Sequence, residues 1–298
     1  MARTKPSVAA PGRRRRVTAW AAVAVTIALC AVGAGAHPQS SPAAAPTLPQ
    51  LRSAAAMVVD QDTHEVLYSK NPDTVQPIAS ITKLMTAMIT LDAKLDPDEM
   101  LAVDNSDYEA TRGQSHLRTG TELTRRQALQ VALMASENRA AHLLGRTYPG
   151  GISAAIEAMN AKARTLRMND SHFADPTGLS QENRSTPADL VRLVEAAYAY
   201  PQIREYSVAS DLTLESGKRR QHFGNTNRLT SRADWDIGLQ KTGYIAAAGR
   251  CLVMQAVIAK RRVVMVFLDS YGKYSRLGDA NRVRAWLLAQ AAAGNPHS

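Results

Sequence analysis

Cysteine is scarce in this sequence: Cys30 and Cys251 are the only two among 298 residues. Cys30 lies in an apolar N-terminal run that we interpret as part of an export signal, so the mature chain keeps a single thiol. One thiol forms no internal disulfide, although an exported protein would meet oxidising conditions. Cys251 stands in the run Gly249–Val253, which is typical of the start of a buried strand. We therefore expect a packed, unreactive thiol.

Metal-binding and phosphate-binding patterns are also missing. The histidines are scattered, with no His-x-x-x-His pair and no cysteine cluster. No glycine-rich phosphate loop occurs, and Asp60, Asp62 and Asp175 form no recognisable carboxylate pair. The sequence therefore predicts no metal and no cofactor. The histidines considered are His64, His116, His142, His172 and His222.

The N-terminus has the three parts of an export signal. Arg13–Arg16 form a basic block, residues 17–32 are almost continuously apolar, and Ala34–Ala36 provide small residues for cleavage. The apolar run is shorter than the roughly 20 residues of a comfortable membrane span. We predict a signal peptide at residues 1–36 and export to the periplasm, with an uncleaved, loosely membrane-associated form as the alternative.

The net charge of +10 gives no case for nucleic-acid binding. Six of the positive charges lie in residues 1–36, which hold no acidic residue, so the remainder carries +4. Residues 37–50 are rich in Pro, Ser and Ala and predict a flexible linker. Residues 51–294 then form one domain without internal repeats, and we expect a monomer.

Hydrophobic patterning predicts an α/β (α+β) fold. Strands at both chain ends flank a block of helices, which favours a largely antiparallel sheet with helices packed on it. Residues 98–120 are polar and predict an irregular segment. Apolar and polar residues partly alternate over residues 206–215. The expected strands are 54–60, 65–70, 238–244, 250–259 and 263–269, and the expected helices are 80–91, 124–135, a second one through 142–143, 152–168, 187–200 and 281–292.

A hydroxyl and an amine stand three residues apart in the stretch Pro77–Met88. Positions three apart on a helix are neighbours, so the side chains of Ser80 and Lys83 meet there. A serine becomes a good nucleophile when an adjacent base takes its proton. Burial on the apolar face that follows would lower the pKa of Lys83 and make it such a base. The alternative is a helix start with a solvated lysine, and the similar run Ser270–Lys273 is interpreted as a chance turn.

Two further short runs carry suitable groups. Ser136-Glu137-Asn138 lies at a break between two helices, where the hydroxyl can relay a proton and the amide can bind a substrate amide or the lysine. A helix cap is the alternative interpretation.

Lys241-Thr242-Gly243 ends a predicted strand and precedes Tyr244. Lys241 and Thr242 offer a cation and a hydroxyl to a carboxylate, and Gly243 allows close backbone approach. The backbone N–H groups of Ser80 and Tyr244 would form an oxyanion hole. The alternative is a surface turn with a solvated lysine.

Together these three runs resemble the active-site set of penicillin-recognising serine acyl-transferases. Over about residues 50–292 the sequence resembles the low-molecular-mass penicillin-binding proteins, which are serine D-Ala-D-Ala peptidases. The run Phe173–Leu179 resembles a loop of that family, and Lys241–Cys251 is similar to its endopeptidase branch. Two departures are Glu137, where many relatives have Asp or Gly, and a chain that ends after one helix, without the β domain of the carboxypeptidase branch.

The resemblance implies a DD-peptidase/β-lactamase-like fold with an inserted all-helical subdomain. Ser80 would be the nucleophile, Lys83 its base and Ser136 the proton shuttle. Asn138, Lys241, Thr242 and Gly243 would bind substrate. The implied partners are peptidoglycan peptides, with β-lactams as covalent inhibitors.

The expected function is a periplasmic D-alanyl-D-alanine endopeptidase that cuts D-Ala–diaminopimelate cross-links through an acyl-enzyme. A D-Ala-D-Ala carboxypeptidase is the near alternative. A β-lactamase is disfavoured because no Glu-x-x-Leu-Asn pattern follows the helical block. A non-catalytic penicillin-sensing module is the remaining alternative. The sequence gives no reason to prefer it, because Ser80, Lys83, Ser136 and Asn138 are all present.

Overall fold

The computed structural model describes residues 47–111, 115–217 and 219–294. These residues belong to the compact unit 43–298. The predicted signal at 1–36 and the predicted linker up to residue 46 lie outside the described residues. Thr47–Gln50, the end of that linker, has no helix or strand.

A five-stranded sheet joins the two ends of the described chain. Its strand order is β2-β1-β11-β10-β9, and every neighbouring pair is antiparallel. This arrangement confirms the prediction of an antiparallel sheet whose strands come from both ends. It leaves β9 as an edge strand. The bounds are β1 Ser53–Asp60, β2 Val66–Lys70, β9 Asp236–Ile245, β10 Gly249–Ile258 and β11 Arg261–Ser270.

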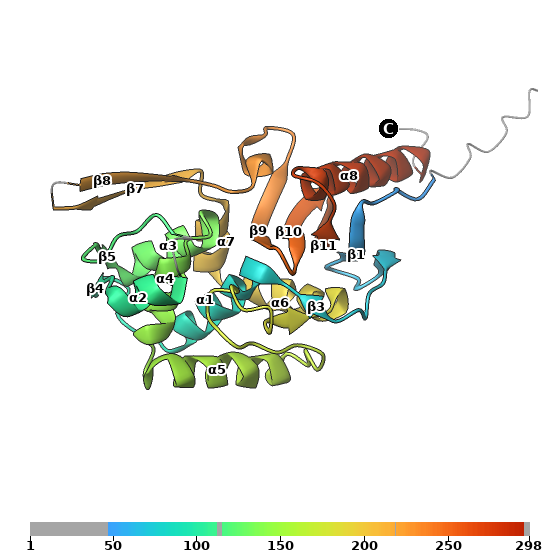
Figure 1. Cartoon of the computed structure of the whole chain (residues 1–298). Coiled ribbons are helices and arrows are strands. Elements are labelled where there is room, and N and C mark those ends of the chain that lie inside the picture. The colour runs from blue at the N-terminus through green and yellow to red at the C-terminus, as the bar shows by residue number, and fades with distance from the viewer. Residues whose placement is uncertain (1–46, 112–114, 218, 295–298) are drawn as a thin grey trace, which may run out of the picture. The chain divides into compact units, whose positions relative to one another are not determined.

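Helices cover both faces of this sheet, which explains the unbroken apolar runs of β10 and β11. Successive strand residues point to opposite faces, and accordingly Leu252 and Met254 join the core under α8, Ser275–Gly294, whereas Cys251 and Val253 join the core on the other side. Figure 1 shows α8 along one face, with α6, Pro187–Tyr198, across the other. Each fully buried side chain of this kind contributes about 1.5–3 kcal/mol.

The segment between β2 and β9 is mainly helical, as predicted. Thr124 begins α3 through a capping box with Gln127, and Thr186 followed by Pro187 begins α6, both as the sequence indicated. The remaining elements of this block are η1 Ala79–Thr82, α1 Lys83–Asp92, α2 Asn105–Thr111, α3 Arg125–Met134, α4 Asn138–Arg146, α5 Gly151–Thr165 and α7 Pro201–Val208.

Several elements in this block differ from the prediction. Residues 98–120, expected to be irregular, contain a strand and α2. The sequence of α2 is polar and has no helical pattern, because tertiary contacts stabilise this short helix. Pro201 does not only end α6; it occupies the first turn of α7, where its missing N–H costs nothing. Helix α8 begins at Ser275, six residues before the predicted start.

Three two-stranded ladders accompany the helices. They pair β3 Gln76–Pro77 with β6 Arg184–Ser185, β4 Met100–Ala102 with β5 Glu122–Thr124, and β7 Asp211–Ser216 with β8 Arg219–Gly224. Strands this short give little alternation for a sequence to reveal. Figure 1 shows β7–β8 as a hairpin at the upper left. Within the described residues, no helix has the length and apolarity that a bilayer span requires.

Candidate active site

The predicted Ser80 lies in η1, the tight turn that leads into α1. Ala79 before it has a φ of 48°, a left-handed conformation that is rare for a residue with a side chain. Two glycines make room for this turn. A Cβ on Gly178 would lie 2.1 Å from the carbonyl oxygen of Ala79, and one on Gly243 would lie 3.1 Å from the nitrogen of Ser80. Gly243 therefore brings β9 directly against the turn of Ser80.

Lys83, at the start of α1, reaches three oxygens from three separate segments. Its Nζ lies 2.9 Å from Oγ of Ser80, 2.7 Å from Oδ1 of Asn138 and 2.6 Å from the carbonyl oxygen of Thr177. The side chain is only 1% exposed. The predicted contact between Ser80 and Lys83 is present, and the solvated-lysine alternative is wrong.

The pKa of Lys83 is lowered from 10.5 to about 7, mainly because burial disfavours its charged form. The carboxylates of Asp175 and Glu137 oppose this shift and keep it from going further. A neutral amine has two N–H groups and one lone pair. Amide and carbonyl oxygens only accept, so in the neutral form Asn138 and Thr177 would take the two N–H groups and leave the lone pair for the hydroxyl of Ser80, whereas the charged form donates to all three oxygens.

The Ser136–Asn138 run lies at the predicted break between α3 and α4. Ser136 has a φ of 60°, so the backbone turns sharply there, and Asn138 begins α4. Thr226 fastens the end of α3 to β9, because its Oγ1 donates to the carbonyl oxygen of Met134 and lies 2.6 Å from Oγ1 of Thr242. The Ser136 turn is thereby tied to the Lys241–Gly243 strand.

Lys241 and Thr242 are buried on β9 beside this turn. The pKa of Lys241 is well below its ordinary value, first because of burial and then because of the charges of Lys83 and Arg276. Its Nζ donates to the carbonyl oxygen of Thr242 at 2.8 Å. The surface-turn alternative for this run is wrong.

Arg276 belongs to this site but was not predicted. It stands in the first turn of α8 and its Nη1 donates to the carbonyl oxygen of Gly243 at 3.0 Å. Burial and the nearby Arg250 lower its pKa. No motif surrounds it in the sequence, so only the packing of α8 beside β9 brings it to the site.

The loop after α5 forms the wall behind Lys83. Asp175 holds it, because its carboxylate accepts hydrogen bonds from the backbone of Thr177, Gly178 and Ser180 at 2.5–2.8 Å. Thr86 of α1 donates to the carbonyl oxygen of Pro176 at 2.7 Å. An aspartate before Pro-Thr-Gly is a turn signal in its own right, and it marks the loop without revealing that Thr177 contacts Lys83.

Glu137, the departure noted in the sequence, is buried rather than exposed. Its carboxylate accepts hydrogen bonds from the hydroxyl of Ser115 and, at 3.1 Å, from the backbone N–H of His116. It thus fixes residues 115–116 beside the Ser136 turn.

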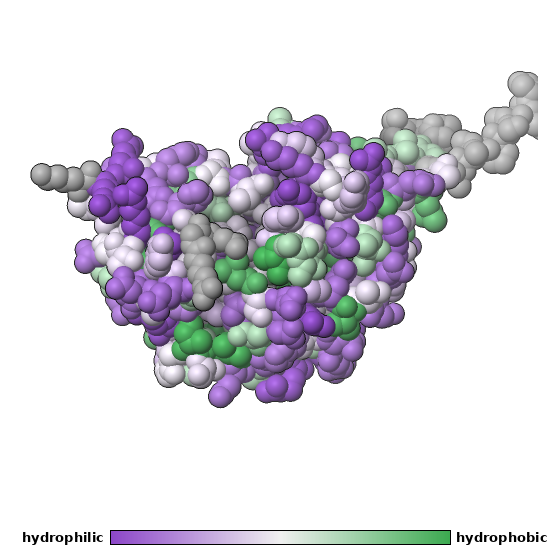
Figure 2. Space-filling view, in the orientation of Figure 1, coloured by the Kyte–Doolittle hydropathy of each residue, from purple (hydrophilic) through white to green (hydrophobic). Residues whose placement is uncertain are grey.

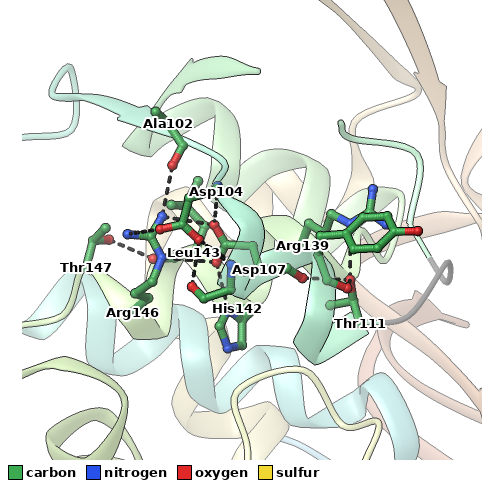
Figure 3. Close-up of polar contacts among 11 residues, drawn as sticks. Ala102, Asp104, Asp107, Thr111, Arg139, His142, Leu143, Arg146 and Thr147 are labelled. Atoms are coloured by element: carbon green, nitrogen blue, oxygen red, sulfur yellow. Dashed lines mark hydrogen bonds and ion pairs between the residues drawn. The ribbon is translucent and has the colours of Figure 1, made fainter. Parts of the chain in front are cut away.

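An ion-pair cluster around the buried Asp107 joins α2 to α4 (Figure 3), the helix that Asn138 begins. Asp107 forms a 2.6 Å hydrogen bond with Nδ1 of His142 and accepts another from Arg146 at 2.9 Å. Burial alone would raise the pKa of Asp107, but these hydrogen bonds outweigh it and lower the pKa. Arg139 contacts Thr111 on the same interface at 3.1 Å. His142 therefore has a structural partner within the described residues.

The run Ser270–Lys273 covers the end of β11 and the turn that follows it, in line with the interpretation as a chance match. The hydroxyl of Ser270 lies 2.6 Å from that of Ser53, and Tyr271 is 85% exposed. Cys251 is fully buried, and burial raises its thiol pKa to about 11. The prediction of a packed, unreactive thiol is confirmed. Among the residues described, no cluster of His, Cys, Asp and Glu is arranged to hold a metal ion.

Comparison with known proteins agrees with this geometry. A family model described as D-alanyl-D-alanine carboxypeptidase matches residues 41–272. The chain is 48% identical to the D-alanyl-D-alanine endopeptidase of Escherichia coli (strain K12) over 242 residues, which cover 80% of this chain and 78% of that protein. It is 47% identical to the Pseudomonas aeruginosa protein of the same name over 245 residues, covering 81% and 79%.

Solved structures show the same fold. The crystal structure of the Streptomyces K15 DD-transpeptidase matches with a TM-score of 0.76 at 26% identity, over 82% of this chain and 99% of that one. A D-alanyl-D-alanine carboxypeptidase from Mycobacterium tuberculosis H37Rv matches with a TM-score of 0.74 at 29% identity, over 83% and 95%. The predicted DD-peptidase-like fold is confirmed.

Proposed function

The chain belongs to the D-alanyl-D-alanine carboxypeptidase family of serine peptidases, and from that premise we propose that it is an exported endopeptidase. Its substrate is the D-Ala–diaminopimelate cross-link of peptidoglycan, and it works in the periplasm. The contact between Lys83 and Ser80 supports the acyl-enzyme chemistry. The preference for cross-links is supported by the relatives at 47–48% identity, which are named endopeptidases.

In the acylation step, Oγ of Ser80 attacks the carbonyl carbon of D-Ala while its proton moves to the lone pair of Lys83. The tetrahedral intermediate then collapses, the C–N bond breaks and the departing amine takes up a proton. Ser136 relays that proton from Lys83. The site starts with neutral Lys83 and ends with neutral Lys83, so no external acid or base is consumed.

Backbone N–H groups from two segments stabilise the negative charge on the oxygen of the tetrahedral intermediate. The N–H of Ser80 and the N–H of Tyr244 stabilise the oxyanion, and the contact of Gly243 with the Ser80 turn brings β9 close enough for both to act. Removing one such donor typically costs about 10²–10³ in rate. Asn138 holds the substrate's peptide while also fixing Lys83.

The carboxylate beside the scissile bond binds at the end of β9. Thr242 offers its hydroxyl and the buried Lys241 its N–H groups, and Arg276 supplies positive potential beside them. A charge-assisted hydrogen bond to a carboxylate is about twice as strong as a neutral one. Water then hydrolyses the ester, which releases the acyl group as a carboxylic acid and returns the proton to Oγ of Ser80. β-Lactams enter the same path and remain as slowly hydrolysed esters of Ser80.

The test combines one mass measurement with one digestion. After penicillin treatment, the intact protein should gain the mass of one antibiotic, mapped to the peptide that contains Ser80. Cross-linked muropeptide dimers should be converted to monomers by the untreated enzyme and not by the Ser80→Ala variant. Dimers that persist while pentapeptides lose terminal D-Ala would identify a carboxypeptidase, which is the second candidate because the matching family model carries that description.

A further inference from the structure

A basic cavity of about 210 Å³ opens beside the Thr242–Gly243 end of β9. Thr226 and Arg276 form its inner wall, and both touch that segment directly. Arg228, Arg250 and Lys273 line it farther out. The cavity therefore continues outward from the place where the carboxylate next to the scissile bond would bind. Figure 2 shows hydrophilic surface along the upper rim of this face, over the β7–β8 hairpin and over the segment around η2, Arg228–Ser231.

The cations of this cavity lack carboxylate partners. Across the described ranges, no ion pair links Arg228, Arg250, Lys273 or Arg276 to an acidic side chain, and Nε of Arg276 is buried without a hydrogen-bond partner. Other arginines do form such pairs; Arg232 with Asp234 is an example at 2.8 Å. Cations gathered without counter-charges repel one another, and an anion relieves that repulsion.

Aromatic rings hold these cations in place. The guanidinium of Arg250 lies 4.5 Å from the ring centre of Tyr244, the residue that faces it across β9 and β10. Arg228 and Lys273 lie 6.0 and 5.6 Å from the ring of Tyr274. Both rings are more than half exposed. A stacked guanidinium keeps its in-plane N–H groups free for a carboxylate and loses little freedom on binding one.

We propose that Arg228, Arg250 and Lys273 form a second carboxylate site, which binds the remote end of the released half of a cross-linked stem. The inference rests on the proposed endopeptidase function and deepens it. A terminal D-Ala leaves with one carboxylate, and Thr242 with Arg276 already accounts for that group. The released half of a cross-link also carries a peptide with further carboxylates, and only such a leaving group can fill the outer cavity. The site thus favours cross-linked over single stems.

The test compares the Arg250→Ala variant with wild type on two substrates, the D-Ala–diaminopimelate-linked muropeptide dimer and the pentapeptide monomer. The ratio of kcat/KM for the dimer to kcat/KM for the monomer should fall about tenfold, through a higher KM for the dimer. Arg250→Glu should lower the ratio further. Arg164→Ala provides the matched control, because Arg164 is an exposed arginine of α5 that has no ion pair with any residue the structure describes, and it should leave both values unchanged.

A chemical counterpart uses a dimer whose remote carboxylates are amidated. The KM of the wild type for the amidated dimer should equal the KM of Arg250→Ala for the native dimer. The KM of the variant should be the same for both dimers. Equal losses on dimer and pentapeptide, an unchanged ratio, or a wild-type KM that ignores amidation would each overturn the proposal.

Binding separates this proposal from the proposed function. In the Ser80→Ala background, titration calorimetry with the native dimer should give a Kd that Arg250→Ala raises about tenfold. If wild type cleaves no dimer but this dependence is present, the endopeptidase assignment fails and the carboxylate site stands. If the dimer binds equally well without Arg250, the carboxylate site is refuted whatever the enzyme cleaves.

Discussion

At the scale of single residues, the proposed mechanism depends on one buried amine. Lys83 is surrounded by apolar side chains of α1 and by three oxygen atoms, and its pKa is lowered to about 7. The sequence predicted the contact with Ser80 from the spacing of three residues on a helix, and the lowered pKa of Lys83 from burial on the apolar face that follows. It did not reveal that Thr177 would be the third oxygen, because that contact joins residues 94 positions apart.

Lys83→Met should abolish the base while keeping a long unbranched side chain in the same space. General-base catalysis contributes about 10²–10⁴-fold, so the penicillin acylation rate should fall by roughly that factor. Stopped-flow acylation measures the rate, and near-UV circular dichroism checks that packing is retained. Acylation at the wild-type rate would show that Lys83 is not the base.

The acylation rate should also depend on pH with a single acid limb. Lys83 acts when neutral, and a lowered pKa means that it loses its proton as pH rises through about 7. The rate constant should therefore rise tenfold per pH unit below about 6 and level off above about 8. An inflection near the ordinary lysine value of 10.5 would contradict the burial argument.

At the scale of elements, the site is a junction of η1, the α3–α4 break, β9 and the loop after α5. Caps and turn residues made most of these boundaries predictable, as Thr124 and Thr186 show. The α2 region was missed because its stability comes from Asp107 bonding to a helix 35 residues away, and such contacts leave no local pattern. Arg276 was missed for the same reason.

Gly178→Ala tests how closely the loop after α5 packs on η1. The residue has a φ of 80°, and a Cβ would lie 2.1 Å from the backbone oxygen of Ala79. The control is Gly120→Ala, with the same φ of 80° and no neighbouring atom within 4 Å. Left-handed backbone alone costs about 1–2 kcal/mol, so the control should lose only that much stability by urea unfolding.

Gly178→Ala should lose more stability than its control, because backbone atoms of η1 must move to admit the new methyl group. Acylation of Ser80 by penicillin should slow as well, since the same movement displaces the nucleophile. Equal stability losses with normal acylation in both variants would mean that the loop does not hold the turn of Ser80.

At the scale of the whole molecule, the two ends of the described chain are locked together. Asp279 of α8 is fully buried and accepts hydrogen bonds from the backbone N–H groups of Arg52 and Ser53 at 2.9 and 2.8 Å, and from the hydroxyl of Ser53 at 2.5 Å. The order of strands and helices predicted that the ends share a sheet. It did not predict this lock, because a lone aspartate in a polar stretch gives no such signal.

Asp279→Ala should lower the free energy of unfolding by about 2–3 kcal/mol, since buried donors lose a charged acceptor. Acylation at 25 °C should stay close to wild type in the fraction that remains folded. Chemical denaturation followed by circular dichroism measures the first quantity. Asp62→Ala, which removes an exposed carboxylate paired with Arg262, is the comparison and should change little. A stable Asp279→Ala protein would show that the lock is dispensable.

The buried thiol of Cys251 has a practical consequence for spectroscopy. It is closed to solvent and its raised pKa keeps it protonated in neutral buffer, so maleimide dyes have no target on the described part of the chain. A cysteine introduced on the β7–β8 hairpin, for instance Arg220→Cys, would be the one accessible thiol of the described residues. Fluorescence from that position would then report on the hairpin, with no contribution from Cys251.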